Sequence, residues 1–296
     1  MIPQIKGRRR TLAHDNRVCG MCDMRISSSK TNTMGETTPE RIPGGSANRM
    51  KVAFFPGCMV DMFYPEIGIA AVNVLERLGC EVEMPEEQVC CGQGLLNSGY
   101  AKETVPVAKN ILDAYDLDEY ETIVSLTGSC MNAIINDYPT VLEDVEYLHK
   151  VERIRPRMFE FTDFIVNQLH VTDVGASFHH KVTYHKSCHV TRMLGIKEPP
   201  LKLLEAVDGL EYIEMVHAER CCGFGGTFSF KEPEISAEIV KEKCATIIET
   251  GADVVCGADV PCLMNIKGAL ARLHAQGAVD RDIRVMHIAQ ILDARE

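Results

Sequence analysis

The sequence contains no tryptophan, and aromatic residues make up 6% of its 296 residues. No uncharged apolar run approaches the roughly 18 residues that a membrane helix requires, so we expect no membrane-spanning segment. The first ten residues lack the apolar stretch of a secretory signal. These absences predict a protein of the cytoplasm.

Positive charge is also scarce. Lys and Arg number 31 against 42 Asp and Glu, which gives a formal net charge of −11. A nucleic-acid-binding protein normally presents a basic face, so we predict no nucleic-acid partner. The glycine-rich segment at Gly223–Gly226 matches neither the dinucleotide fingerprint nor the phosphate loop, and no zinc-protease motif is present. We therefore predict no nucleotide site.

Cysteine, in contrast, is abundant, with 13 residues. Structural disulfides are rare in a reducing compartment, and the number of cysteines is odd. Such a composition favours metal binding or redox chemistry over a disulfide framework.

Composition divides the chain into three parts. Residues 1–49 are polar and rich in Gly, Pro and Ser, which predicts a disordered extension. An apolar run then begins at Met50, and we predict two domains, 50–172 and 173–296. The pair Cys19 and Cys22 has the C-x-x-C spacing of a metal or redox site. It lies in the extension with no second pair nearby, so we leave it out of the predicted site.

The folded part of the chain repeats itself. In each half a strand-like run leads to a cysteine, a helix-like stretch follows, a Cys-Cys-Gly triplet comes next, and a further strand-like run precedes a last cysteine. The two copies are offset by 130 residues at the first cysteine, 131 at the double cysteine and 132 at the last. A closing helical pattern around Phe161 recurs around Ile288, at an offset of 127. Four markers in the same order indicate an internal duplication.

Short apolar strands alternate with helical stretches in each half, which is typical of βαβ units around a mostly parallel sheet. We therefore predict an α/β protein with two homologous Rossmann-like halves related by a pseudo-two-fold axis. Cys58, Cys130 and Cys188 directly follow strand-like runs, and ligands in open α/β sheets bind at the carboxyl ends of strands. The cysteines are thus placed where a site is expected.

Each half contains four candidate ligands, the number that an iron–sulfur cluster or a tetrahedral zinc site requires. An isolated cysteine is usually a small buried hydrophobe. The repeated order, the double cysteine and the following glycine favour metal binding instead. The eight candidates are Cys58, Cys90, Cys91 and Cys130 in the first half and Cys188, Cys221, Cys222 and Cys262 in the second.

The adjacent cysteines help to choose the metal. Zinc sites usually take paired ligands from C-x₂₋₄-C loops, so that two thiolates converge on one ion. Side chains of neighbouring residues diverge, which fits better with two different irons of one cluster. The glycines Gly92 and Gly223 would permit the tight turn that a bulky cluster demands. The pattern favours an iron–sulfur cluster and leaves zinc open in one half.

The pattern resembles the duplicated cysteine-rich CCG domain found in heterodisulfide reductase and in iron–sulfur subunits of glycolate and glycerol-3-phosphate oxidation systems. It is most similar to the lactate-utilisation protein A family. The segments that carry this resemblance are residues 62–68, 90–93, 97–100, 185–189 and 221–229. The resemblance covers the chain from about Met50 onward. It implies a [4Fe–4S] electron-transfer component of a complex that oxidises L-lactate to pyruvate. It also implies a companion iron–sulfur protein with ferredoxin-like motifs and a third subunit.

One departure from the wider family pattern affects the expected cluster. That pattern ends in C-x-x-C, which gives five cysteines per domain and is associated with a non-cubane [4Fe–4S] cluster. This sequence has Thr127 three residues before Cys130 and Asp259 three residues before Cys262. The resemblance therefore implies a four-thiolate cluster, or one with an oxygen ligand from Asp259.

The remaining cysteines and three histidines carry weaker signals. Cys80, Cys244 and Cys256 have no counterparts in the repeat, and we expect them to pack in the core. Three histidines flank the second predicted site, where a hydrogen bond to a thiolate would tune a cluster's potential, or they are structural: His185, His189 and His217.

Two other functions remain open at this point. A zinc-stabilised scaffold subunit would use the same cysteines without redox chemistry, and a thiol–disulfide catalyst would use the double cysteines directly. An iron–sulfur subunit of a related 2-hydroxy-acid oxidation system is a further alternative for the substrate.

Overall fold

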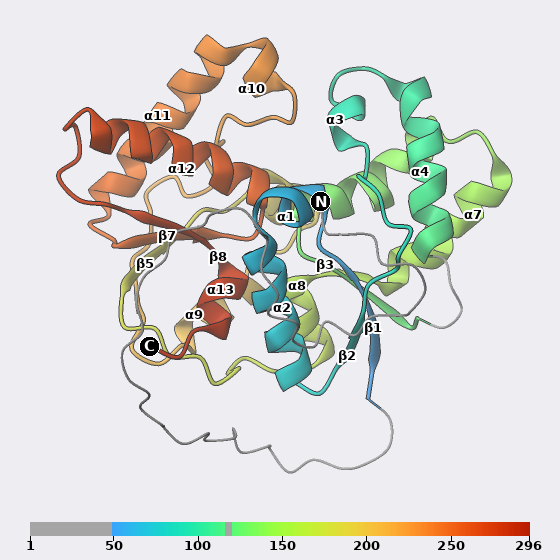
Figure 1. The fold of residues 1–296 in the computed structure, drawn as a ribbon, viewed down its shortest axis with the longest axis horizontal. Helices are drawn as coiled ribbons and strands as arrows, with labels where there is room; N and C mark the ends of the chain where they lie inside the picture. Colours follow the sequence, from blue (N-terminus) through green and yellow to red (C-terminus); the bar gives the residue numbers. More distant parts are fainter. Residues whose placement is uncertain (1–48, 116–119) are drawn as a thin grey trace, which may run out of the picture.

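The computed structural model describes residues 49–115 and 120–296 (Figure 1). The predicted disordered extension and the Cys19–Cys22 pair lie outside the described residues. The described part contains two four-stranded sheets, and every strand pair in them is parallel. The predicted α/β class and the two homologous halves are confirmed.

The two sheets have the same strand order. In the first sheet the strands are β2 (Glu81–Glu83), β1 (Lys51–Phe55), β3 (Thr122–Ser125) and β4 (Met158–Glu160). In the second they are β6 (Glu211–Tyr212), β5 (Lys181–Tyr184), β7 (Val254–Gly257) and β8 (Arg284–His287). The register repeats as well, because Lys51 pairs with Glu81 as Lys181 pairs with Glu211.

Helices connect the strands of both sheets. Those of the first half are α1 (Cys58–Phe63), α2 (Pro65–Arg77), α3 (Gln93–Leu96), α4 (Ala101–Tyr115), α5 (Gly128–Asn132), η1 (Ala133–Asp137), α6 (Tyr138–Val141), α7 (Val145–Ile154), η2 (Arg155–Arg157), α8 (Phe161–Asp163) and η3 (Phe164–Gln168). Those of the second are η4 (His189–Met193), α9 (Pro199–Glu205), α10 (Phe228–Lys231), α11 (Pro233–Glu249), α12 (Val260–Ala275) and α13 (Ile288–Asp293). Here η1, η3 and η4 are π-helical turns, and η2 is a 3₁₀ turn. Within the described ranges, no helix is long and apolar enough to cross a membrane.

Alternating side chains of the central strands serve two different cores. In β1, Val52 and Phe54 belong to a core that also contains Val182 and Tyr184 of β5, so the two halves share it. Ala53 of β1 belongs to a separate core of the first half, and a third core lies under α11 and α12 in the second. The shared core fixes the two sheets relative to each other.

The closing helix of each half packs against the other half. Helix α13 lies beside α2, and Figure 1 shows the pair between the two sheets. Likewise α8 and η3 contact α9. The α2–α13 contact is fixed by polar groups, because Arg77 Nη2 donates to Asp293 Oδ1 at 2.5 Å and Asn73 Nδ2 donates to Asp293 Oδ2 at 2.8 Å.

The halves also approach closely next to two of the cysteines. Helix α5, which contains Cys130, packs on η4, which follows Cys188. At Gly128 an added Cβ would lie 2.3 Å from Val190 Cγ2, so this contact requires a glycine. The two candidate sites are therefore neighbours across the junction.

Candidate metal centres

The eight predicted ligands gather into two equivalent sets at the carboxyl ends of the central strands. Cys58 begins α1 directly after β1, and Cys130 lies in α5 after β3. In the second half, Cys188 precedes η4 after β5, and Cys262 lies in the first turn of α12 after β7. The double cysteines approach from the loops that follow β2 and β6. The eleven described cysteines are all free thiols.

In the first half the thiols are in mutual contact. Cys58 Sγ lies 3.6 Å from Cys90 Sγ. The hydrogen bond between them raises the pKa of Cys58 and lowers that of Cys90, because one thiol donates to the other's thiolate. Hydrogen bonding to Cys130 and Cys90, together with full burial, raises the pKa of Cys91. Cys90 is exposed to solvent, whereas Cys91 and Cys130 are buried.

The second half has the same pattern of buried and exposed thiols. Cys222 and Cys262 are buried neighbours, and Cys221 is exposed like Cys90. Burial, and to a lesser extent the charge of Cys221, raises the pKa of Cys188. Each set thus has a buried side formed by two thiols and an open side formed by the other two.

The glycine of each Cys-Cys-Gly triplet has a positive φ, +74° at Gly92 and +82° at Gly223. At Gly223 a Cβ would also lie 2.8 Å from the carbonyl oxygen of Ser236. The resulting turn directs the backbone N–H of Gly92 to Cys90 Sγ at 3.5 Å, and that of Gly223 to Cys221 Sγ at 3.3 Å. Such N–H···S bonds stabilise a thiolate and tune the potential of a cluster that it binds.

A buried carboxylate joins the two sites. Asp259, 2% exposed, accepts hydrogen bonds from Ser129 Oγ at 2.8 Å and Ser187 Oγ at 3.1 Å. Ser129 precedes Cys130 of the first set, and Ser187 precedes Cys188 of the second. Asp259 Oδ2 also lies 3.8 Å from Cys262 Sγ. Burial raises the pKa of this carboxyl, and the two hydroxyl bonds partly offset that effect. The link through Ser129 was not predicted from the sequence.

A second polar contact crosses the same junction. His189 Nδ1 lies 3.7 Å from Cys188 Sγ, and its Nε2 lies 3.0 Å from Gln93 Nε2 of the first half. Close by, Ser98 Oγ and Thr227 Oγ1 are 2.5 Å apart. His189 thus contacts the thiol of Cys188, in agreement with one of the two roles considered for it from the sequence.

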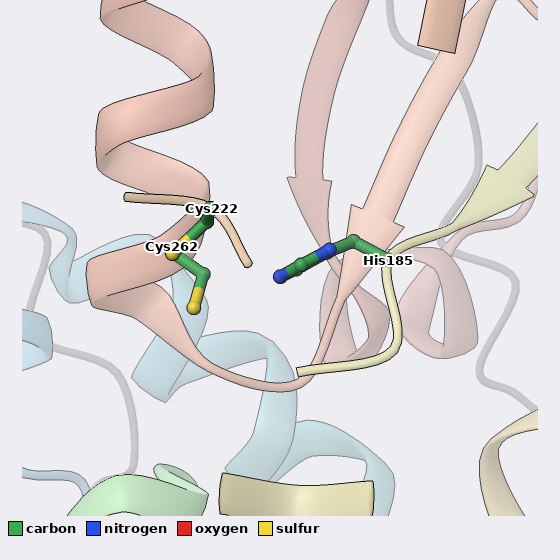
Figure 2. Close-up of side chains that lie close together, drawn as sticks. All are labelled: His185, Cys222 and Cys262. Carbon is green, nitrogen blue, oxygen red and sulfur yellow. The ribbon is translucent and has the colours of Figure 1, made fainter. Parts of the chain in front are cut away.

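The other two predicted histidines differ from each other. His217 is exposed, and its backbone carbonyl accepts from Lys243 Nζ at 3.1 Å. His185 is 1% exposed, and one ring nitrogen lies with the sulfurs of Cys222 and Cys262 in a group whose atoms are all within 4.8 Å of one another (Figure 2). Burial, followed by the charge of Lys243, lowers the pKa of His185 to about 3, so its ring is neutral.

A buried lysine near the second site was not predicted from the sequence. The Lys243 side chain on α11 is fully buried, and Nζ also donates to the carbonyl of Ala218 at 3.0 Å. Burial lowers its pKa to about 8. The α11 sequence gives no signal for this residue, since a buried lysine on a helix cannot be told from an exposed one by its spacing.

The three cysteines without counterparts are fully enclosed in hydrophobic cores, as expected for packing residues. Cys80 and Cys256 belong to the shared core, and Cys244 belongs to the core of the second half. Burial raises the pKa of each thiol, so these side chains remain protonated and unreactive.

The donor sets fit an iron–sulfur cluster. Soft thiol donors converge, two in each set are buried, and each exposed thiol accepts a backbone N–H. Several buried thiolates would repel one another, and the positive charge of bound metal ions would offset this repulsion.

Comparison with known proteins places the chain. The model of the cysteine-rich CCG domain matches residues 52–135 and 182–267, one copy in each half. Lactate utilization protein A of Bacillus pumilus is 50% identical over 247 residues, which cover 83% of this chain and all of that protein. The chain belongs to the lactate utilization protein A family. The Bacillus subtilis member is 46% identical over the same share of both chains. The resemblance predicted from the cysteine pattern is confirmed.

Among solved structures, a hypothetical protein from Helicobacter pylori resembles this chain with a TM-score of 0.58 at 12% identity. The match covers 83% of this chain and 49% of that one, and it supports the fold alone. The family membership rests on sequence, through the two cysteine-rich domain matches and the identity to the lactate utilization proteins.

Proposed function

We propose that this chain is the iron–sulfur electron-transfer component of a complex that oxidises L-lactate to pyruvate. The eight cysteines would bind the clusters, most simply one [4Fe–4S] cluster per half. The observation that carries the proposal is the pair of equivalent thiol sets at the strand ends, each with an N–H···S bond from its Cys-Cys-Gly turn. The name of its relatives supports the substrate.

When bound, such a cluster accepts and donates single electrons. In each half, two buried thiols, one partly buried thiol and one exposed thiol would hold it, and burial and N–H···S bonds would set its potential. The exposed thiols of Cys90 and Cys221 would mark the side at which electrons enter and leave. Lactate oxidation releases two electrons, so a catalytic partner must take them from the substrate carbon.

That requirement supports the proposed partners, a companion iron–sulfur protein with ferredoxin-like motifs and a third subunit. We place the complex in the cytoplasm, because a reducing compartment keeps this number of thiols free. The domain limits 50–172 and 173–296 remain part of the proposal, since the two family matches fall one inside each.

Zinc in one half is a second candidate, favoured by one observation. Cys222, Cys262 and His185 form a buried group of the donor types that hold structural zinc. A half with zinc would stabilise the fold and leave electron transfer to the other half.

Anaerobic purification with iron, zinc and sulfide analysis and EPR tests the proposal. We expect brown protein with about four irons per occupied site and an EPR signal that appears on reduction. Adding the companion proteins and lactate should reduce the clusters. Cys80→Ala is the matched control and should leave the iron content unchanged. A protein that stays free of iron after reconstitution with ferrous iron and sulfide would contradict the proposal.

A further inference from the structure

The two candidate sites differ at one position of the repeat. His185 follows β5 and Phe55 ends β1, and both lie three residues before the first cysteine of their half. Phe55 belongs to the same hydrophobic core as Cys91 and Cys130, and it packs edge-on against Tyr115 with the ring centroids 5.4 Å apart. The second half has an imidazole where the first half has a phenyl ring.

The imidazole of His185 makes no hydrogen bond of normal geometry among the described residues. Both ring nitrogens are buried, and the nearby backbone of Ala218 does not satisfy either of them in this geometry. An unsatisfied buried polar group lowers the stability of the folded state. Figure 2 shows the ring pointing from the end of β5 toward the thiols of Cys222 and Cys262. The protein therefore keeps a costly polar group aimed into the metal site.

We propose that His185 is a direct nitrogen ligand of the metal centre in the second half, alongside Cys222 and Cys262. This assignment rests on the proposed function, in which the cysteine sets bind metal. It makes the two centres chemically different, with all-thiolate ligation in the first half and mixed nitrogen–sulfur ligation in the second.

Asp259 is the competing candidate for an additional ligand, and its contacts argue against it. Its Oδ1 accepts from Ser129 and its Oδ2 from Ser187, so both oxygens already have hydroxyl donors. The neutral imidazole of His185 has one nitrogen with a free lone pair, and no hydrogen bond of normal geometry occupies it. We therefore assign Asp259 to the contact between the two halves and His185 to the additional metal ligand.

A nitrogen ligand changes what the centre does. Histidine is a neutral ligand and thiolate is anionic, so replacing or supplementing a thiolate by histidine raises the reduction potential of a cluster. The second centre would then be the better electron acceptor of the two. Electrons that enter at the first site would move toward the second.

The test uses the full-length chain reconstituted with ferrous iron and sulfide, with histidine labelled by ¹⁵N. Pulsed EPR of the reduced protein should show strong hyperfine coupling to a histidine nitrogen. The signal should change from the ¹⁴N pattern to the ¹⁵N pattern when the histidine is labelled. Absence of any strong histidine coupling in a protein that carries both clusters overturns the assignment and leaves the proposed function intact. A protein without iron at either site overturns both.

Variants identify the histidine. His185→Phe, which copies the first half, should abolish the nitrogen coupling and lower the iron content by up to one site. His185→Cys should retain iron, lose the coupling and shift the second centre to a lower potential. His287→Asn removes another fully buried imidazole and should leave coupling and iron content as in the wild type. Persistence of the coupling in both His185 variants would overturn the proposal.

Discussion

The two halves have the same fold but different side chains around their thiols. Around the first set the neighbouring side chains are Phe55 and Thr127; around the second they are His185 and Asp259, with Lys243 behind them. The strand order, the glycine turns and the places of the four cysteines in the repeat are the same. Duplication thus preserved the scaffold that positions four thiols, and substitution changed the polarity around them. Two centres of one ancestry can therefore have different potentials.

The largest test of this comparison removes one buried thiol from each half. Cys91→Ser should remove the metal of the first half, with about four irons lost per cluster, and Cys222→Ser should remove that of the second. Iron and sulfide per chain measure both effects. Cys80→Ala is the matched control, because this buried thiol lies in the shared core, which contains none of the eight predicted ligands. Loss of both centres from either single variant would show that the halves do not bind metal independently.

The halves also begin their closing helices differently. The buried carboxylate of Glu160 accepts from Thr162 N at 2.9 Å at the start of α8, and His287 Nδ1 accepts from Ala289 N at 3.2 Å at the start of α13. Burial raises the pKa of Glu160 from 4.5 to about 7 and lowers that of His287 from 6.5 to about 4. Both residues prefer to be neutral in the folded protein.

Their effects on stability should therefore run in opposite directions with pH. As pH rises from 4.5 to 7, the unfolded chain ionises Glu160 freely and the folded chain does not, which lowers the free energy of unfolding by about 3 kcal/mol. As pH falls from 6.5 to 4, the unfolded chain protonates His287 freely and the folded chain does not, which also lowers the free energy of unfolding. Glu160→Gln should reduce the loss of stability as pH rises, and His287→Asn should reduce the loss as pH falls. Anaerobic urea unfolding at pH 5, 6 and 8 measures both effects. Identical pH profiles in wild type and variants would contradict this.

A smaller effect is expected where α5 meets η4. The first half has Gly128 at this contact, whereas the matching position of the second half is Val260. Gly128→Ala would bring a methyl group to 2.3 Å from Val190 Cγ2 and should destabilise the protein by about 1–3 kcal/mol. Gly268→Ala is the control, since nothing lies within 4 Å of its added Cβ, and it should stabilise α12 by up to about 1 kcal/mol. Equal unfolding midpoints for the two variants would argue against a tight junction.

The smallest effect concerns two equivalent grooves between the halves, of which one is open and the other is nearly filled. A cavity of about 620 Å³ lies beside Met131, Ile135 and Leu194, and its counterpart beside Leu263, Lys267 and Tyr64 has about 80 Å³. Lys267 Nζ lies 5.4 Å from the centroid of the Tyr64 ring. Lys267→Ala should lower the free energy of unfolding by about 0.5–1 kcal/mol. Lys202→Ala at the open groove is the control and should have a smaller effect.

Much of this structure could be predicted from the sequence. The strand-like runs expected before the first and last cysteines of each half are the central strands β1, β3, β5 and β7, because a buried parallel strand needs a continuous apolar segment. The helix-like stretch expected after the first cysteine of the repeat includes α2, which begins with Pro65 and ends at Arg77. The spacing of the double cysteines predicted which thiols assemble, since equal offsets in a duplicated fold place residues at equal positions.

What the sequence did not show are contacts between segments with no pattern in common. The periodicity of the closing helices predicts an apolar face but not its partner, so their packing on the opposite half was not foreseen. Ser129 and Asp259 are ordinary residues until the fold places them 2.8 Å apart. His185 was placed near the second set by its position in the sequence. Its unpartnered nitrogens follow from the packing around it.

The packing of each closing helix on the opposite half affects how the chain folds as it is synthesised. The face of α2 that α13 covers is made early, and α13 is made more than two hundred residues later. At typical translation speeds of about 5–20 residues per second, this leaves that face uncovered on the ribosome for on the order of ten to forty seconds. During this interval the thiols of the first half would be accessible, and the core that it shares with the second half would be incompletely packed. Metal delivery to a nascent chain would meet a site that later becomes half enclosed.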